Sequence, residues 1–333
     1  MHEMIHRPVT LRDVAVKAGV STSTVSRVLD ERIQSKSETA KRVREIAEEL
    51  GYRRNTYASS LRRGETTLIG VVVPRLTDAV MALMFEAIER AARKRGHVAV
   101  VTTSGDEPDD EIQAVERLLD RNVDSVILAT ARLDDTLPAS LRQKGLRHAL
   151  VLRTDGTSPS SLGDDFQGGY FAVRHLVDLG HRDIAIITGP EFTSSAHDRV
   201  AGAKQALEEA GISIDASKVI FASYGIEAGI AFGKELLAQD PPTAIFAAND
   251  NIAIGIMTAA EQAGLKIGRD LSIVGYNDIP LAERLPVSLT SVRVPFDNIA
   301  ETALDLLANP DPNPIRRAMP VLMPRRSTSH PAG

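Results

Sequence analysis

The chain has 333 residues, of which 43% are hydrophobic and 25% are charged, with 39 Lys and Arg against 44 Asp and Glu. This length predicts two or three domains with sizeable cores, and the lack of cysteine excludes disulfides, thiolate metal sites and thiol nucleophiles. Because no apolar run approaches the roughly 18 residues of a membrane span and residues 1–8 lack a secretory apolar core, we expect a cytoplasmic protein with no membrane association.

The charges are unevenly distributed along the chain. Residues 1–64 hold 13 Lys and Arg against 8 Asp and Glu, a net charge of +5, whereas the remainder carries a net charge of −10. A small basic module attached to an acidic body favours a polyanionic partner for the module alone. A chance fluctuation over so short a segment is the alternative.

Residues 2–6 match the His-Glu-x-x-His pattern of zinc proteases. That site needs both imidazoles on one face of a helix held against a core. Pro8 follows directly, and the match lies at the end of the sequence. We therefore expect residues 1–8 to be a disordered tail and the chain to hold no metal.

The stretch from Thr10 to Asp30 predicts two short helices. Thr10 can cap the first, with Asp13 completing a capping box, and Gly19 then turns the chain before Ser21 caps the second. On the second helix, one face is apolar and the opposite arc carries hydroxyls and a guanidinium. The apolar face is Val25, Val28 and Leu29, and the polar arc is Thr22, Ser23, Ser26 and Arg27. This pattern favours a DNA-binding helix-turn-helix, and the alternative is a capped helical hairpin with a solvated face.

A third helix is expected after Ser35 or Ser37, either of which could cap it, and it should end at Gly51. Its apolar positions, Val43, Ile46, Ala47 and Leu50, would close the small core. Residues 55–64 could form a further short helix that carries Ala58 and Leu61. Ten residues are marginal as an isolated helix in water, so a plain linker is the alternative.

From Leu68 onward the pattern alternates between strands and helices, which predicts parallel sheets. The first series is strand 68–73, helix 79–95, strand 98–102, helix 108–121 and strand 125–129. The second is helix 169–179, strand 184–188, helix 198–210, strand 219–221, helix 226–237, strand 244–247, helix 252–263 and strand 271–274. Gly96-His97 and Gly180-His181 each close a helix before a core strand, so we expect two similar α/β lobes. Their bounds would be about 67–164 with 293–323, and about 165–292.

Ligands of open parallel sheets bind beyond the carboxyl ends of the strands. The loops that follow the predicted strands are polar, which suits a small polar molecule. They contain Pro74 and Asp78, Arg153, residues 193–199, Tyr224, Asn249-Asp250 and Asn277-Asp278. No Gly-x-Gly-x-x-Gly or Walker loop follows a strand, so a nucleotide-dependent enzyme is disfavoured and no cofactor is expected.

The amino-terminal motif and several segments of the body resemble the LacI family of bacterial transcription regulators. The resemblance extends from Val9 to about Thr328. The motif segments are 9–15, 19–21 and 24–29, and the body segments are 198–202, 248–250, 274–278 and 289–292. The resemblance implies a helix-turn-helix headpiece and a two-lobed effector domain with the fold of periplasmic sugar-binding proteins.

For DNA, the resemblance implies that Thr22, Ser23 and Arg27 read operator bases. It also implies that residues 55–64 form a hinge that folds on the operator, with Leu61 inserted into the minor groove. The expected DNA contacts are Thr10, Ser21, Thr22, Ser23, Thr24, Ser26, Arg27, Asn55, Tyr57, Ala58 and Leu61. Ser35-Lys36 departs from the Val-Ser that is frequent in the family.

For the effector, the resemblance implies contacts in the cleft between the lobes. The expected contact residues are Asp78, Arg153, Ser195, Arg199, Tyr224, Asn249, Asn277, Asp278 and Phe296. Arg153 and Asn277 stand where an acid is frequent in the family, and Val80-Met81 replaces the usual aromatic pair. Arg153 would suit an anionic group, although a lobe-to-lobe ion pair is an equal alternative. For Arg199 the alternative to an effector contact is an internal salt bridge.

We therefore expect a homodimeric transcriptional repressor that binds palindromic double-stranded operator DNA and responds to a small effector, a sugar or another polar metabolite. The helices at 79–95 and 225–237 are candidates for the dimer face. We expect no catalysis, cofactor or metal. The alternative is a solute-binding protein without DNA function, which explains the body but not the headpiece.

Overall fold

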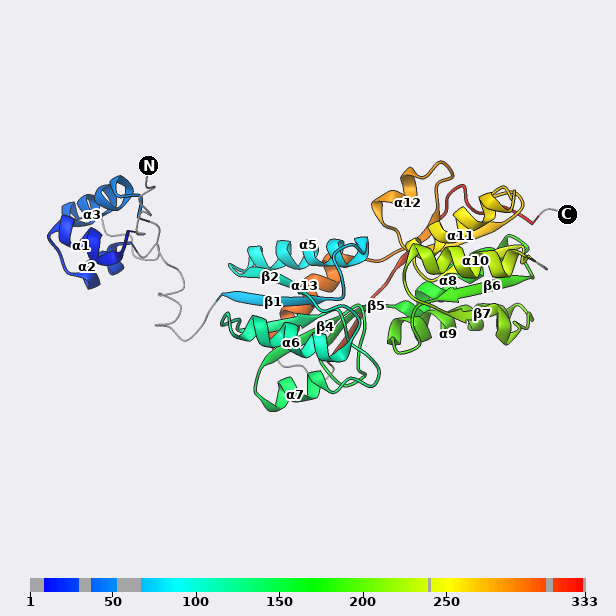
Figure 1. Cartoon of the computed structure of the whole chain (residues 1–333), viewed down its shortest axis with the longest axis horizontal. Coiled ribbons are helices and arrows are strands. Elements are labelled where there is room, and N and C mark those ends of the chain that lie inside the picture. Colours follow the sequence, from blue (N-terminus) through cyan, green and yellow to red (C-terminus); the bar gives the residue numbers. More distant parts are fainter. Residues whose placement is uncertain (1–8, 30–36, 53–66, 239–240, 310–313, 332–333) are drawn as a thin grey trace, which may run out of the picture. The chain divides into compact units, whose positions relative to one another are not determined.

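The computed structural model describes residues 9–29, 37–52, 67–238, 241–309 and 314–331, and divides the chain into two compact units, 1–66 and 67–333 (Figure 1). The predicted tail, the Ser35-Lys36 departure and the predicted hinge lie outside the described residues. Within the described ranges, no helix is both long enough and apolar enough to span a membrane.

The first unit contains α1 (Leu11–Ala18), α2 (Thr22–Val28) and α3 (Glu38–Glu49). They pack around a small core that includes Val14, Val25 and Val43, all fully buried. The predicted caps are confirmed by their hydrogen bonds: the capping box at the start of α1 is complete, and Ser37 caps α3. Gly19, at φ 67°, ends α1 in the left-handed region that favours glycine. This turn sets α2 across α1 as a helix-turn-helix requires.

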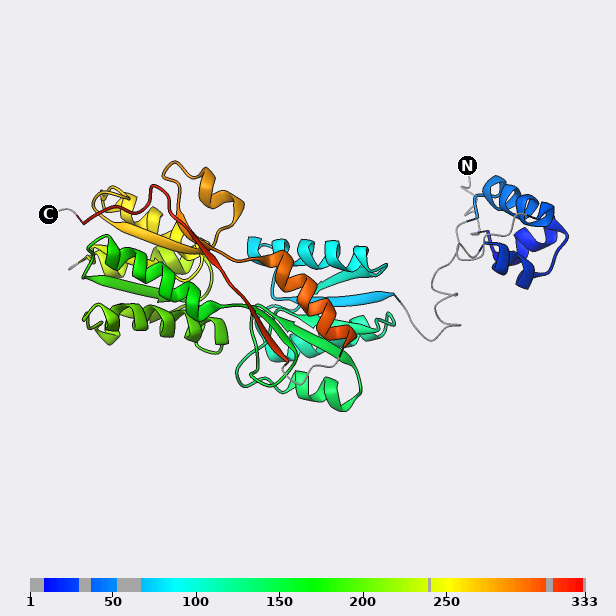
Figure 2. The same ribbon diagram turned by 180° about the vertical axis from the view of Figure 1, so that it is seen from behind.

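The second unit begins with a parallel sheet in the order β11-β5-β4-β3-β1-β2. Its strands are β1 (Leu68–Val73), β2 (Val98–Thr103), β3 (Ser125–Leu128), β4 (Arg147–Val151), β5 (Ser160–Gly163) and β11 (Ile315–Ala318). On one face Val71 packs against α5 (Ala79–Lys94) and α13 (Phe296–Ala308), which lie side by side in Figure 2. On the other, Val72 packs against α6 (Pro108–Leu119) and α7 (Leu137–Gln143). This sheet and its helices form the first lobe.

The second lobe has a sheet in the order β12-β10-β9-β8-β6-β7, parallel except for β12. Its strands are β6 (Ile184–Thr188), β7 (Val219–Phe221), β8 (Ala244–Ala247), β9 (Ser272–Asn277), β10 (Thr290–Arg293) and β12 (Val321–Met323). Its helices are α8 (Asp165–Asp178), α9 (Ser194–Glu209), η1 (Ala216–Lys218), α10 (Ile226–Leu237), α11 (Asp250–Gln262) and α12 (Pro280–Arg284). Neighbouring residues of β9 point to opposite faces of the sheet, Tyr276 toward α8 and Gly275 toward α11. The packed pair α8 and α9 therefore covers one face, and the packed pair α10 and α11 covers the other.

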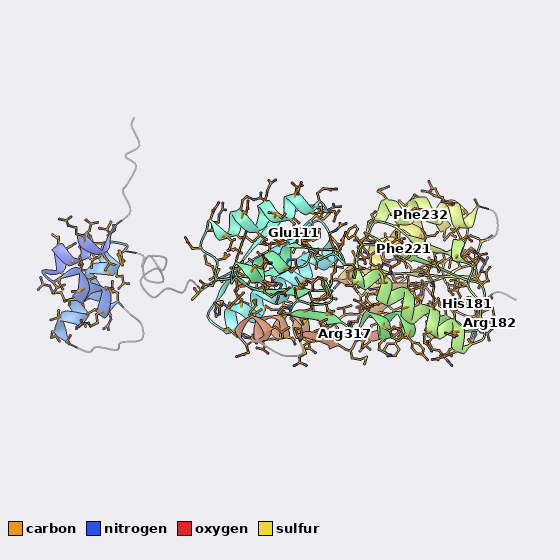
Figure 3. All side chains as sticks on the ribbon, turned by 90° about the horizontal axis from the view of Figure 1, so that it is seen from below. Glu111, His181, Arg182, Phe221, Phe232 and Arg317 are labelled. Atoms are coloured by element: carbon orange, nitrogen blue, oxygen red, sulfur yellow. The ribbon has the colours of Figure 1, made fainter. Side chains whose placement is uncertain are left out.

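The predicted similarity of the lobes is confirmed at the two Gly-His pairs. Gly96 and Gly180 have φ 74° and 97° and follow the ends of α5 and α8, each just before a strand. His181 lies at the end of the second lobe that is farthest from the first (Figure 3). Its ring nitrogens are 2.9 Å from the Thr243 hydroxyl and 2.9 Å from the Ser329 carbonyl oxygen. It is a structural histidine, as the sequence indicates.

One predicted lobe boundary is wrong. The sequence places residues 293–323 in the first lobe, but β12 pairs antiparallel with β10 of the second sheet, Met323 opposite Ser291. After β11 the chain crosses back to the second lobe (Figure 2). A three-residue strand that pairs with a segment about thirty residues earlier leaves no local periodicity for a sequence pattern to reveal.

Three helices begin two to four residues earlier than the apolar periodicity predicts. α8 begins at Asp165 and α11 at Asp250, because Asp164 and Asn249 accept the capping hydrogen bonds. α9 begins at Ser194, although Thr193 makes no side-chain capping bond. These earlier starts place polar side chains at the ends of the strands.

The helices on the second sheet pack closely because glycines face backbone. A Cβ atom on Gly202 of α9 would lie 1.8 Å from the carbonyl oxygen of Phe166 in α8, and one on Gly169 would lie 2.0 Å from that of Arg199. The α10–α11 pair repeats the arrangement, since a Cβ on Gly255 would lie 2.2 Å from the carbonyl oxygen of Ile226. Any side chain at these positions forces the helices apart.

We expect Gly202→Ala to lower the free energy of unfolding of the second unit by about 1–3 kcal/mol, because relieving the clash disturbs a packed helix pair. Urea unfolding followed by circular dichroism measures the change. Gly225→Ala is the control, since its new Cβ would meet only a serine side chain at 3.8 Å. Equal stability of the Gly202 variant and the unaltered chain would refute this account of the packing.

Candidate functional site

The second helix of the first unit presents an exposed polar surface. Thr22, Ser23 and Arg27 are exposed and Ser26 is half-buried, whereas Val25 and Val28 face the core. Thr22 and Arg27 make no side-chain hydrogen bond or ion pair within the described residues. Their polar groups are therefore available for an external partner, as base reading by a recognition helix requires.

Other predicted DNA contacts have structural roles in the unit. The Thr10 hydroxyl is 2.7 Å from Asp13 Oδ2, as part of the cap of α1. Ser21 Oγ accepts a hydrogen bond from the Thr24 amide at 3.1 Å and lies 2.7 Å from Ser23 Oγ. These hydroxyls fix the start of α2. The predicted contacts at Asn55, Tyr57, Ala58 and Leu61 lie outside the described residues.

In the second unit, most of the predicted effector residues meet around one cavity between the lobes. Asp78, Arg153, Ser195, Arg199, Tyr224, Asn249 and Asn277 line it together with Val80, Met81 and Leu152. A wider cavity of about 290 Å³ adjoins it and shares Asp78, Met81, Arg153 and Tyr224. Such a volume is close to that of typical small-molecule sites.

The carboxyl ends of the strands place these side chains, as the sheet rule predicts. Arg153 follows β4, Asn249 follows β8, and Asn277 ends β9. Leu152 has φ 64° and Asn277 has φ 97°, so two residues that are not glycine adopt left-handed backbone at the cavity. Strain of this kind clusters at functional sites, and here it turns the chain into the cleft.

Arg199 is held inside the second lobe. Its Nε donates to Asp165 Oδ1 at 2.8 Å and its Nη1 to the Ala248 carbonyl oxygen at 2.5 Å, and its guanidinium carbon lies 3.8 Å from the centroid of the Tyr276 ring. Its side chain is only 7% exposed, yet it borders the cavity. The internal salt bridge that the sequence left open as the alternative for Arg199 is therefore present. These contacts hold the Arg199 side chain in a fixed position at the wall of the cavity.

Ser195, Tyr224 and Asn249 form a connected group on the same lobe. Ser195 Oγ lies 3.0 Å from Tyr224 Oη, and Asn249 Nδ2 donates to the Tyr224 carbonyl oxygen at 3.1 Å. A Cβ on Gly189 would lie 1.9 Å from the Tyr224 ring, so glycine is required for the ring to reach the cleft. Sequence reasoning missed Gly189 and Asp165, since neither lies in a motif, although Gly189 does follow the predicted strand 184–188.

Two predicted effector residues do not border this cavity. Asp278 accepts hydrogen bonds from Arg293 at 2.7 Å and Arg325 at 2.6 Å, so its carboxylate ties β9 to the chain that crosses between the lobes. Phe296 begins α13 and packs against the core. The strand-end pattern selected Asp278, whereas Phe296 was expected only from the resemblance to the family.

The lobes touch through a few polar contacts at the cleft. The Thr154 amide donates to Ser194 Oγ at 2.9 Å, and Asn251 Nδ2 lies 3.4 Å from Asp78 Oδ1. The Arg153 guanidinium faces the Tyr224 ring across the cleft at 5.5 Å. A ligand that contacts both lobes and binds one of their arrangements better than the other can shift the balance between these arrangements.

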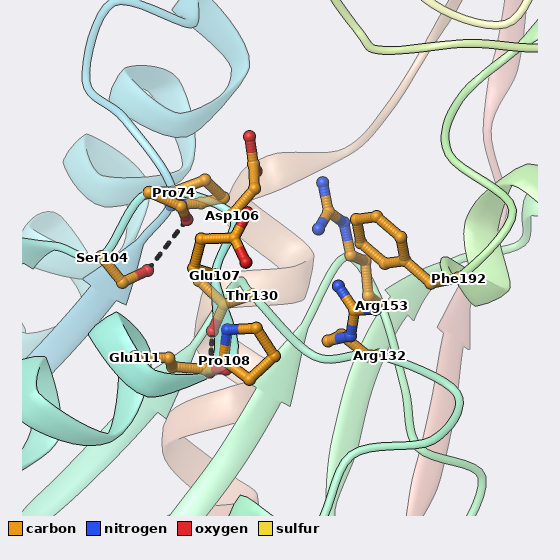
Figure 4. A pocket seen from close by; sticks show the side chains of 11 residues that line it. Pro74, Ser104, Asp106, Glu107, Pro108, Glu111, Thr130, Arg132, Arg153 and Phe192 are labelled. Carbon is orange, nitrogen blue, oxygen red and sulfur yellow. Dashed lines mark hydrogen bonds between the residues drawn. The ribbon is translucent and has the colours of Figure 1, made fainter.

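A third pocket borders Arg153 on the first-lobe side (Figure 4). Arg132, Arg153 and Phe192 lie on one side of it, with Asp106 and Glu107 on the other. At its base Glu111 accepts a hydrogen bond from Thr130, and burial raises the pKa of Glu111 to about 7. The pocket therefore has basic side chains on one side and acidic side chains on the other. Among the described residues no group of three or more acidic or histidine side chains could hold a metal ion.

An exposed recognition helix and a two-lobed unit with a polar cavity, carried by one chain, define a ligand-responsive DNA-binding regulator. Family models agree: bacterial regulatory proteins of the lacI family match residues 10–55, and the periplasmic binding protein-like domain matches residues 173–328. The transcriptional regulator DegA of Bacillus subtilis is 33% identical over 86% of this chain and 87% of its own length. Catabolite control protein A of Priestia megaterium is 32% identical over 90% of this chain and 91% of its own.

The fold is also that of a solved regulator. The lac repressor dimer bound to operator and the anti-inducer ONPF matches with a TM-score of 0.87 and 28% identity, over 97% of this chain and 100% of that one. The chain belongs to the LacI family of bacterial transcriptional regulators.

Proposed function

We propose that this regulator is a homodimeric repressor that binds a palindromic operator and is controlled by a small polar effector in the cleft. Residues 9–54 would read DNA, 55–66 would connect as hinge and linker, and 67–328 would bind the effector and dimerise. The function would be binding and not catalysis, since the similar curated proteins are regulators. The observation that carries the proposal is that Thr22 and Arg27 on α2 are exposed and make no side-chain hydrogen bond or ion pair within the described residues.

The dimer follows from the symmetry of a palindrome. Two headpieces must be related by a two-fold axis to read two half-sites, and the lac repressor is described as a dimer on its operator. The outward parts of α5 and α10 remain our candidates for the dimer face. Isologous contacts along these helices would pair the same face of both subunits.

Control by the effector requires that the ligand binds one arrangement of the lobes better than the other, because equal affinity shifts no equilibrium. The cavity supplies such differential contacts, since its lining comes from both lobes: Asp78 and Arg153 from the first, Ser195 and Asn249 from the second. Opening the cleft would separate these groups. Transmission to the operator would then pass through residues 55–66.

We expect Arg27→Ala to weaken binding to a specific duplex by about 1–3 kcal/mol, as for a lost bidentate contact to a base, while binding to random DNA is spared. Fluorescence anisotropy with a duplex enriched by the unaltered chain from random sequences provides the measurement. Arg42→Ala on the exposed side of α3 is the control and should affect both duplexes alike. An equal loss on both duplexes for Arg27→Ala would remove this residue from base reading.

A further inference from the structure

Arg153 is a buried cation without an anionic partner in the described part of the chain. It is 6% exposed and makes no ion pair or hydrogen bond there, and its contact is with the face of Tyr224 at 5.5 Å. Burial lowers the pKa of Arg153, although a guanidinium remains charged in proteins. Leaving a buried charge unpaired is costly. Arg199, equally buried in the same cleft, has its partner Asp165 at 2.8 Å.

The carboxylates that face Arg153 are engaged elsewhere. Asp78 caps the start of α5. Asp106 pairs with Arg75, and Glu111 accepts a hydrogen bond from a threonine of its own lobe. The lobe-to-lobe ion pair that the sequence left open for Arg153 is therefore not formed, and its charge faces the cavities between the lobes.

A second buried polar side chain lines the same cavity from the opposite lobe. Asn277 is 5% exposed and its amide makes no hydrogen bond within the described residues. Asn249 differs, because its amide bonds both the Ile252 amide at 2.8 Å and the Tyr224 carbonyl oxygen at 3.1 Å. Buried polar groups are almost always hydrogen-bonded. Among the described polar residues that line the cavity, Arg153 and Asn277 are therefore the two whose side chains make no hydrogen bond, one a cation on the first lobe and the other a neutral amide on the second.

We propose that the effector is a small hydroxylated monocarboxylate, whose carboxylate binds Arg153 and whose uncharged polar end binds Asn277. This inference rests on the proposed effector control and names its ligand class. A planar guanidinium fork matches a carboxylate in a bidentate manner. A doubly charged phosphate is less suitable, because Asp78 and Asp106 also face Arg153 and repel a second negative charge more strongly. Val80, Met81 and Leu152 supply an apolar wall for the carbon chain.

The test is calorimetric titration and thermal shift of the full chain, without DNA, with a panel of lactate, glycerate, gluconate and glucuronate. Glucose and glucose 6-phosphate at matched ionic strength are the neutral and dianionic comparisons. We expect at least one monocarboxylate to bind more tightly than both comparisons. Arg153→Met should weaken its binding by about 10- to 100-fold, as for a lost charged hydrogen-bonding partner. Asn277→Gly, which suits φ 97°, should weaken it as well.

Arg132→Met is the matched control, because Arg132 stacks on Phe192 at 3.8 Å and does not border the cavity shared by Arg153 and Asn277. It should bind the monocarboxylate normally. In the absence of ligand, a single cooperative thermal transition should show that Arg153→Met is folded, so that weaker binding reports on the lost contact. Tighter binding of glucose 6-phosphate or glucose, no binding by any monocarboxylate, or equal binding by Arg153→Met would overturn the proposal. Operator binding, measured separately, would stand in each case.

Discussion

Replacing Arg199 by alanine should lower the free energy of unfolding of the second unit by about 3–5 kcal/mol, as when one partner of a buried ion pair is removed. The carboxylate of Asp165 is 5% exposed and would lose the Nε donor at 2.8 Å. Tyr276 would also lose the guanidinium that covers its ring. Urea unfolding of the full chain, followed by circular dichroism, measures the loss.

The free energy of unfolding lost in Arg199→Ala should increase as the pH rises. Burial raises the pKa of Asp165, and without Arg199 the folded chain avoids the unpaired charge by binding a proton there. A raised pKa in the folded state makes stability fall as the pH rises, so the deficit should be larger at pH 8 than at pH 5. Arg174→Ala, which removes an exposed pair with Asp178 on α8, should change nothing measurable. A deficit as small as that of the control would refute the role given to the buried pair.

Asp250→Ala should also lower the free energy of unfolding of the second unit strongly. Asp250 Oδ1 accepts a hydrogen bond from Ser291 Oγ at 2.6 Å and Oδ2 accepts one from the Ile279 amide at 2.7 Å, joining α11 to strand β10 and to the segment that follows β9. Each buried donor left without an acceptor costs about 1–3 kcal/mol. Thermal unfolding of the variant at pH 6 measures the sum. A loss no greater than that of Asp250→Asn, which keeps the shape and an acceptor, would contradict the assignment.

Asp250 also predicts part of the pH dependence of stability. Burial raises the pKa of Asp250 to about 7, above its value in an unfolded chain. The folded state therefore binds the extra proton, so stability from this group is complete below about pH 4 and is lost as the pH rises through about 7. The free energy of unfolding of Asp250→Asn should therefore depend less on pH than that of the unaltered chain. An identical pH dependence in both would contradict the role given to Asp250.

The local signals of the sequence predicted much of the fold. Thr10 with Asp13, Gly19 and Ser21 specify the helix-turn-helix, because caps and turns act within a few residues. Strands such as 184–188 and 244–247 have the predicted bounds, since fully buried strands are continuous apolar runs. The missed elements include β5, whose sequence Ser-Ser-Leu-Gly has little strand preference, and β12, which is ordered by a distant partner.

The sequence predicted which residues lie at the cleft but not which hydrogen bonds and ion pairs they form. Arg153, Asn249 and Asn277 were predicted there because each lies at the carboxyl end of a strand. No sequence pattern showed that Arg199 pairs with Asp165, 34 residues earlier, or that Asp278 is held by two arginines. Whether a charged side chain is satisfied depends on side chains far apart in sequence, and this is what separates Arg153 from Arg199.

The most direct test of the central claim is enrichment of duplexes from a random-sequence pool by the full, unaltered chain at moderate salt with excess competitor DNA. We expect one inverted repeat to be enriched and to be bound at least about 1,000-fold more tightly than random DNA, as specific binding by regulators requires. Footprinting should then show both half-sites protected on opposite strands. Recovery of unrelated sequences, with affinities no better than that for random DNA, would contradict the claim that this chain is a sequence-specific regulator.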